Sequence, residues 1–192
     1  MKAMVSCSGI GKGMRLAERP DEELVSAVMG GDVDSFVVLC HRYYPLLVAI
    51  ARAVLGDGHL AEDAAQETFA KVCRRLNDLK NPKRFGAWIA TICRNEAGDI
   101  LRRSPKIISL NERDIPAKAH DSNPETDAVR EILNLMPPES RELLYLRYRN
   151  NLSYEAMADL LDISVEAVNG RLRRARLEVK THLEHSRNRK SS

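Results

Sequence analysis

Apolar side chains recur every three or four residues along most of this chain, which is the spacing of helices with one buried face. Within 60–76, for example, Ala65, Phe69, Val72 and Leu76 form one such stripe. The same spacing predicts further helices over 20–29, 33–55, 85–103, about 125–136, 138–148, 154–161 and from 164 onward. Leu, Ala, Arg and Glu are abundant and β-branched runs are few, so the pattern predicts an all-α fold.

The ends of these predicted helices carry residues that start or stop helices. Pro20 is followed by three acids, which suit the positive end of a helix dipole. Gly30–Gly31 and Gly56 follow predicted helices, where glycine often ends the helix. Ser153 and Ser164 precede two others, and their hydroxyls can accept from the first free backbone N–H groups.

A polar stretch divides these helices into two groups. Pro105, Pro116 and Pro124 interrupt it, so we expect a flexible linker. The predicted organisation is a disordered Gly- and Ser-rich extension over 1–19, a helical domain over 20–103, the linker over 104–124, a helical domain over 125–185 and a basic tail over 186–192.

The second helical group ends in the pattern of a helix-turn-helix. A short helix over 154–161 meets a tight corner at Asp162–Ile163, and a long arginine-rich helix follows. Val165, Val168 and Leu172 should face the preceding helix. Arg and Asn on the open side can contact phosphates and base edges, which favours DNA binding over a merely solvated basic helix.

The net charge of +3 conceals an uneven distribution. Residues 57–67 contain four acids and no Lys or Arg. Residues 74–106 contain nine bases and three acids, and residues 163–192 contain eight bases and three acids. Phosphates attract the two basic stretches, whereas the acidic stretch would repel DNA and suits a basic protein partner.

No set of residues suggests catalysis, so we expect no enzyme activity and no cofactor. His182 and His185 lie one helical turn apart but lack a third ligand, which argues against a metal site. The four cysteines form no CxxC pair and are expected to be reduced thiols: Cys7, Cys40, Cys73 and Cys93. No apolar run has the length of a signal peptide or of a membrane span, so we expect a cytoplasmic protein without membrane insertion.

Several stretches of the chain resemble one protein family. Residues 60–69 read LAEDAAQETF and resemble region 2.2 of the extracytoplasmic-function (ECF) sigma factors of bacterial RNA polymerase. Residues 85–95 read FGAWIATICRN and resemble regions 2.3 and 2.4. Residues 135–142 and 152–176 resemble region 4. Region 4 alone is weakly specific, because other regulators share its fold, but the two region 2 stretches are highly specific.

This resemblance implies a fold and a function. The fold would be two small helical domains, a region 2 bundle and a region 4 helix-turn-helix, joined by a flexible linker. The function would be to bind core RNA polymerase, through its β′ coiled coil and β flap, and to direct promoter recognition, DNA melting and transcription initiation. The implied partners are core polymerase, promoter DNA and an anti-sigma factor.

The resemblance also assigns residues to three surfaces. The core-polymerase-binding residues would be Glu62, Asp63, Gln66 and Glu67. The minus-ten DNA-binding residues would be Lys80, Asn81, Lys83, Arg84, Trp88, Arg94, Asn95, Asp99, Arg102 and Arg103. The minus-thirty-five DNA-binding residues would be Ser164, Glu166, Ala167, Asn169, Gly170, Arg171, Arg173 and Arg174. The turn 77–84 corresponds to the family's loop for a flipped base, and Trp88 either faces this DNA or packs in the core.

The chain departs from the family pattern at a few positions. Asp162 stands where glycine is frequent, and residues 166–171 read EAVNGR where the family often has GTVKSR. These changes leave the minus-thirty-five sequence preference open. Ala64 and Ala65 replace larger residues, so local packing there could differ.

Two other functions stay open. A stand-alone helix-turn-helix regulator would bind DNA unaided and would have no need for the acidic helix. A module that sequesters another helical protein would tolerate loss of Arg171, Arg173 and Arg174, whereas a sigma factor would not. The acidic helix itself could also be only a solvated face.

Overall fold

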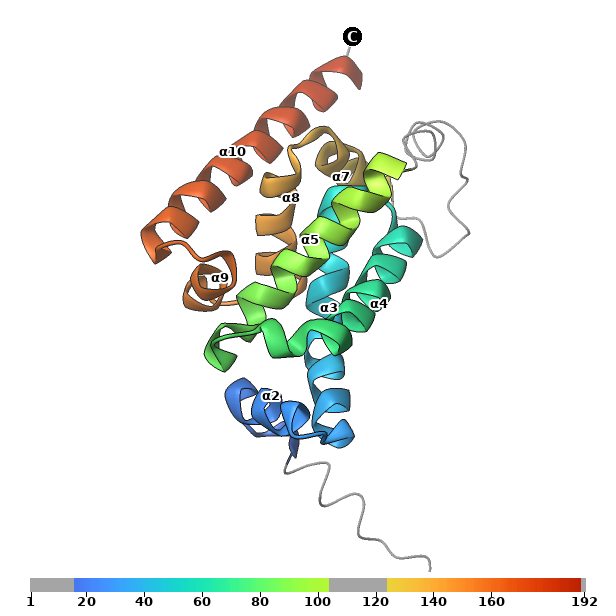
Figure 1. Cartoon of the computed structure of the whole chain (residues 1–192). Helices are drawn as coiled ribbons and strands as arrows, with labels where there is room; N and C mark the ends of the chain where they lie inside the picture. Colours follow the sequence, from blue (N-terminus) through green and yellow to red (C-terminus); the bar gives the residue numbers. More distant parts are fainter. Residues whose placement is uncertain (1–15, 104–123, 191–192) are drawn as a thin grey trace, which may run out of the picture.

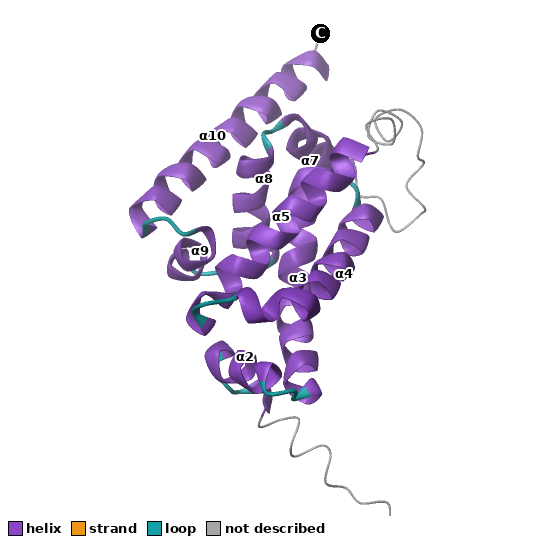
Figure 2. Cartoon of the chain, in the orientation of Figure 1, coloured by secondary structure: helices purple, strands orange, loops and turns teal. Residues whose placement is uncertain are grey.

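The computed structural model describes residues 16–103 and 124–190, and within them every regular element is a helix (Figures 1 and 2). The N-terminal module comprises α2 (Asp21–Met29), α3 (Val33–Leu55), α4 (Gly58–Arg75), the 3₁₀ turns η1 (Leu76–Asp78) and η2 (Pro82–Arg84), and α5 (Phe85–Arg103). The C-terminal module comprises α7 (Pro124–Leu135), α8 (Pro138–Leu144), the π-helical turn η3 (Tyr145–Arg149), α9 (Tyr154–Leu161) and α10 (Val165–Lys190). The all-α prediction is confirmed. Most of the predicted extension and nearly all of the predicted linker lie outside the described residues.

Capping residues and glycines mark the ends of several helices. The Ser153 hydroxyl accepts from the Ala156 N–H at 3.1 Å, which caps α9. The Asp57 carboxylate caps α4 in the same way, through the Leu60 N–H at 2.8 Å. Gly56 ends α3 at φ 72°, a left-handed conformation that glycine adopts without strain.

Helix α3 is the centre of the N-terminal module, and α2, α4 and α5 all pack on it. By length and composition alone it could cross a membrane, although no such segment was predicted from the sequence, and 44% of its most apolar part is buried inside this protein. Leu39, Leu47 and Ile50 are fully covered by the neighbouring helices. The apolar character of α3 is therefore accounted for by packing in the helical core.

The small residues of α4 fit it closely against the rest of the module. Ala61, Ala64 and Ala65 are 0% exposed, and Thr68 beside them donates to the Ala64 carbonyl at 2.7 Å. Small side chains at a helix contact allow the two backbones to approach. The two alanines that depart from the family pattern are thus core residues of the α4 contact.

The two modules pack against each other. Helix α8 and the turn η3 contact α3, and α9 contacts α5 (Figure 1). Buried residues from both modules, such as Ile50 and Leu146, belong to one hydrophobic cluster. Nothing in the sequence pattern indicated this contact.

One predicted helix differs in detail. The apolar spacing over 138–148 predicts a single helix, but α8 ends at Leu144 and the chain continues as a π-helical turn. A π turn adds residues per turn and rotates the side chains that follow. Tyr148, which the spacing placed in the apolar pattern, lies in this turn and is 63% exposed.

Candidate functional site

The four predicted core-polymerase-binding residues share one exposed face of α4, and this face is called the acidic face below. Glu62, Asp63, Gln66 and Glu67 are all exposed, whereas Ala61, Ala64, Ala65 and Thr68 between them are buried. Within the described parts of the chain, none of the three acids forms an ion pair. The carboxylates are therefore free to contact a basic partner.

Five of the predicted minus-ten residues line one hollow of about 360 Å³, called the loop hollow below. They are Lys80, Asn81, Arg84, Trp88 and Arg94. Lys80 and Asn81 come from the segment between η1 and η2, and the Asn81 carboxamide oxygen accepts from the Lys83 N–H at 3.1 Å to start η2. The residues that the family resemblance assigned to a base-holding loop thus surround a space next to α5.

Trp88 packs against a core residue and also lines the loop hollow. Its ring lies 6.2 Å from that of Phe85, which is buried and in edge contact with Tyr43 at 5.2 Å. Trp88 is itself only half-buried and lines the loop hollow. Phe85 therefore anchors the start of α5 in the core and holds Trp88 at the wall of the hollow.

The other predicted minus-ten residues lie outside the loop hollow. Lys83 is exposed and its ammonium lies 3.5 Å from the Glu22 carboxylate. Asn95, Arg102 and Arg103 are exposed farther along α5, and Asp99 forms an ion pair with Arg102. At 1.5 Å per residue, Arg103 lies about 13 Å beyond Arg94 along the helix axis. The structure thus separates the ten residues into a group around the hollow and a group near the end of α5.

Arg84 and Arg94 are already paired with acids of the C-terminal module. Arg94 donates to the Glu142 carboxylate through Nε and Nη2, and Arg84 lies 2.6 Å from Asp162. The contact with Asp162 raises the pKa of the Arg84 guanidinium above its usual value. Glu142 was not among the predicted functional residues, because a single glutamate on a short helix forms no recognisable sequence pattern.

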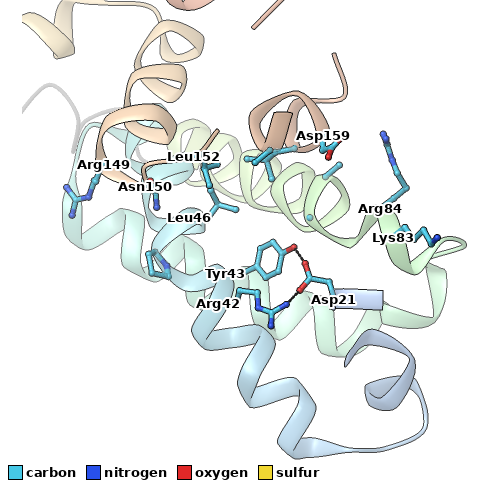
Figure 3. Close-up of a pocket in the computed structure, with 15 residues that line it drawn as sticks. Asp21, Arg42, Tyr43, Leu46, Lys83, Arg84, Arg149, Asn150, Leu152 and Asp159 are labelled. Atoms are coloured by element: carbon cyan, nitrogen blue, oxygen red, sulfur yellow. Dashed lines mark hydrogen bonds and ion pairs between the residues drawn. The ribbon is translucent and has the colours of Figure 1, made fainter. Parts of the chain in front are cut away.

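A larger cleft of about 870 Å³ opens between the modules (Figure 3). Asp21 lies on one wall and contacts both Arg42 and the Tyr43 hydroxyl. Burial and the neighbouring Asp21 raise the pKa of Tyr43, so this phenol stays neutral. Arg149 and Asp159 lie on the opposite side, from the C-terminal module (Figure 3).

The predicted minus-thirty-five residues lie at the start of α10, on its open side. Glu166, Asn169, Arg171, Arg173 and Arg174 are exposed, and Ala167 and Gly170 are half-buried. The exposed Ser164 caps the helix by accepting from the Ala167 N–H at 3.2 Å. The opposite side carries the buried Val168 and Leu172, as the spacing predicts.

The first turn of α10 also fixes one acid. The backbone N–H of Glu166 and the Ser164 hydroxyl donate to the Glu166 carboxylate, which lowers its pKa. This acid stays charged at neutral pH and is oriented by the helix cap. A carboxylate held in this way can accept from a cytosine amino group in a major groove.

Replacing Gly170 with alanine is expected to stabilise the protein by about 1 kcal/mol, because glycine is a poor helix former. A Cβ at Gly170 would meet only the end of the Arg174 side chain, at 3.8 Å. Gly56→Ala is the matched control and should destabilise the protein, because Gly56 has φ 72°. Thermal unfolding measures both, and a lower melting temperature for Gly170→Ala would contradict the expectation.

One cluster near the helix-turn-helix was not predicted. The Arg176 guanidinium donates to the hydroxyls of Tyr148 at 2.8 Å and Tyr154 at 3.1 Å, and these contacts raise its pKa. Arg147 lies over the Tyr154 ring, 5.4 Å from its centre. The cluster joins η3, the start of α9 and α10, so it links the two helices of the motif. No metal-binding group of three or more His, Cys, Asp or Glu side chains occurs among residues 16–103 and 124–190.

Comparison with known proteins connects these surfaces with one family. Sigma-70 region 2 matches residues 39–106 and Sigma-70, region 4 matches residues 126–179. The chain is 30% identical to the ECF RNA polymerase sigma-E factor of Escherichia coli K12 over 173 residues, which are 81% of this chain and 90% of that protein. It is 37% identical over 149 residues to a probable RNA polymerase sigma factor RfaY of Xanthomonas campestris pv. campestris, covering 71% of this chain but only 37% of that longer protein.

A solved structure agrees with this relationship. The structure of CnrH in complex with the cytosolic domain of CnrY superposes with a TM-score of 0.63 at 26% identity, over 86% of this chain and 97% of that one. The exposed acidic face, the loop hollow beside Trp88 and the helix-turn-helix all lie within the matched regions. The chain belongs to the ECF sigma factors, the subunits that bind core RNA polymerase and direct it to promoters.

Proposed function

We propose that this sigma factor divides its work among three charged surfaces. The acidic face of α4 docks on the β′ coiled coil of core polymerase. The loop hollow and the basic end of α5 hold the opened minus-ten element, and the start of α10 reads the minus-thirty-five element. The observation that carries this proposal is the acidic face. Its acids are all exposed, whereas the two stretches that are expected to face DNA are basic.

Binding energy rather than catalysis drives each of these steps. Unstacking a base costs a few kcal/mol, and contacts in the loop hollow offset that cost. Lys80 and Asn81 are exposed at its rim and can contact the phosphate and the base edge. Trp88 offers an aromatic face for stacking, as in other sites that bind single strands. The protein therefore acts in the cytoplasm as a specificity subunit without enzyme activity of its own.

The functional modules proposed here are 20–103 for region 2 and 125–185 for region 4. The family matches at 39–106 and 126–179 support both, and α2 extends the first module because it packs on α3. An anti-sigma factor is a further expected partner. The related CnrH has been solved with the cytosolic domain of CnrY, which supports an equivalent protein partner for this chain.

Transcription from promoter DNA with purified core polymerase tests this function. A genomic promoter library serves as template, because the promoter sequence is unknown. The chain should produce transcripts with defined start sites only in the presence of core enzyme, and DNA footprints should appear only with the same mixture. Sequence-specific binding by the chain alone, without transcripts, would instead support a stand-alone regulator.

A further inference from the structure

The start of α2 is fastened to α3 by a network around one carboxylate. Asp21, the first residue of α2, accepts from the Arg42 guanidinium and from the Tyr43 hydroxyl (Figure 3). Arg42 also donates to the backbone carbonyls of Ala17 at 2.8 Å and Arg19 at 2.9 Å. Asp21 therefore keeps Arg42 as a partner when the Tyr43 hydroxyl is removed, so the hydroxyl can be tested by itself.

Tyr43 in turn fits closely against the first turn of α5. Its ring is in edge contact with that of Phe85, at 5.2 Å between the ring centres. A Cβ at Gly86 would lie 3.0 Å from the Tyr43 hydroxyl oxygen, which is closer than ordinary van der Waals contact, but 3.6 and 3.7 Å from the nearest ring carbons. Glycine at position 86 therefore allows α5 to approach the end of the Tyr43 side chain.

The same turn of α5 carries residues that face the loop hollow. Phe85 is 1% exposed, and its ring lies 6.2 Å from that of Trp88, which lines the hollow. Arg84 directly precedes Phe85 and lines the hollow as well. Because core side chains are closely packed, a shift of Phe85 would move both Arg84 and Trp88.

Helix α2 also supports the segment that leads into α5. It contacts both η2 and α5, and its Leu24 and Val25 are 0% exposed, so α2 is anchored in the core. Glu22 of α2 lies 3.5 Å from Lys83 of η2. Helix α2 precedes the residues that match Sigma-70 region 2, so that match assigns it no part in minus-ten recognition.

We propose that Tyr43 is a positioning residue for base capture: held by Asp21 and fitted against Gly86, it sets the place of η2 and the start of α5 around the loop hollow. This inference rests on the proposed minus-ten role of the hollow. Tyr43 is 9% exposed and acts through Phe85 and Trp88 rather than by touching the base. A pocket that captures an unstacked base must be held near its productive geometry, because small displacements weaken its contacts.

Two single variants and their combination test the fit. Tyr43→Phe removes the hydroxyl and keeps the ring against Phe85, and Gly86→Ala adds the Cβ that meets the hydroxyl. Each is expected to lower the equilibrium constant for base unstacking about tenfold. In the double variant the Cβ meets only ring carbons at ordinary contact distance. The double variant should therefore lose about tenfold, rather than the roughly hundredfold loss of two independent changes.

Unstacking is measured in the complex of each variant with core polymerase. The probe is a promoter duplex, taken from a library template that gives transcripts, with the fluorescent base 2-aminopurine in the minus-ten element. Tyr44→Phe is the matched control for the hydroxyl, because Tyr44 is the neighbouring half-buried tyrosine. Gly98→Ala is the control on α5, because its Cβ would meet only the end of the Arg102 side chain, at 3.6 Å. Both controls should unstack the base like wild type.

Affinity for core polymerase separates positioning from general support of the fold. Tyr43→Phe should bind core polymerase like wild type, because the acidic face lies on α4. Normal unstacking in both Tyr43→Phe and Gly86→Ala would overturn the positioning role. A loss of core affinity that parallels the loss of unstacking would overturn it as well, because Tyr43 would then support the whole module. A roughly hundredfold loss in the double variant would overturn the fit between Tyr43 and Gly86.

Transcription by the wild-type chain separates failure of this inference from failure of the proposed function. If the wild-type chain directs core polymerase to defined start sites and the variants unstack the base normally, the function stands and the positioning role fails. If the wild-type chain directs no transcripts, the proposed function fails and the positioning role falls with it.

Discussion

Replacing Asp63 with alanine is expected to weaken binding to core RNA polymerase by about 30-fold, or about 2 kcal/mol, which is the loss typical of a central charged contact in an interface. Asp63 lies in the middle of the acidic face and is exposed. The change removes a carboxylate while leaving the helix intact, because alanine has the higher helix propensity. The melting temperature should therefore stay the same or rise.

Asp78→Ala is the matched control for this experiment. Asp78 is 59% exposed in the same module and forms a surface ion pair with Arg75, at 3.0 Å. Both variants lose one negative charge, so a general electrostatic effect would weaken both equally. Fluorescence anisotropy of a labelled chain titrated with core enzyme measures the two affinities. Normal affinity of Asp63→Ala would show that the acidic face is only solvated and does not dock.

The sequence was sufficient to predict the helices, because apolar spacing and capping residues mark each helix locally. Val168 and Leu172 repeat at the helical spacing and are buried, and Ser153 and Ser164 cap the helices that follow them. Such signals act over one or two turns, and a single sequence contains all of them. The helix-turn-helix could therefore be predicted down to its corner residue.

Contacts between the modules could not be predicted in this way. Arg94 and Glu142 are 48 residues apart in sequence, and each lies on a helix whose polar positions also suit water. A pair of this kind has no spacing rule, because it depends on how two modules meet. The structure also divides the minus-ten residues between the loop hollow and the end of α5, whereas the family resemblance could only assign them to one surface.

Asp162 combines an unfavourable backbone conformation with an ion pair to the other module. Its departure from glycine is visible in the sequence as an unfavourable residue for a left-handed corner. The structure supplies a compensating contact, the ion pair with Arg84 in the other module. Positions that break a local rule are often functional, and this one points to the contact that periodicity could not reveal.

Replacing Arg171, Arg173 and Arg174 together with alanine is expected to lower the affinity of the chain's complex with core polymerase for duplex promoter DNA by about a thousandfold at moderate salt. All three are exposed on the open side of α10, and the buried Leu172 between them fixes their direction. Each arginine that contacts phosphate releases counterions, so the slope of log affinity against log salt should fall by about 2.7. The fold should persist, because alanine favours the helix.

Replacing Arg19, Arg74 and Arg75 with alanine is the matched control, since it removes the same charge from exposed positions of the N-terminal module. That variant should keep nearly all of its affinity for the duplex and its salt slope. Titrations of a labelled duplex, taken from a library template that gives transcripts, with this complex at several salt concentrations distinguish the two sets. If the α10 variant still supports transcription with core polymerase, the arginines do not read the promoter. A chain that never directs transcription, and whose α10 variant binds DNA like wild type, would instead fit a module that only sequesters a helical protein, because such a module needs a matching helix face and no phosphate contact.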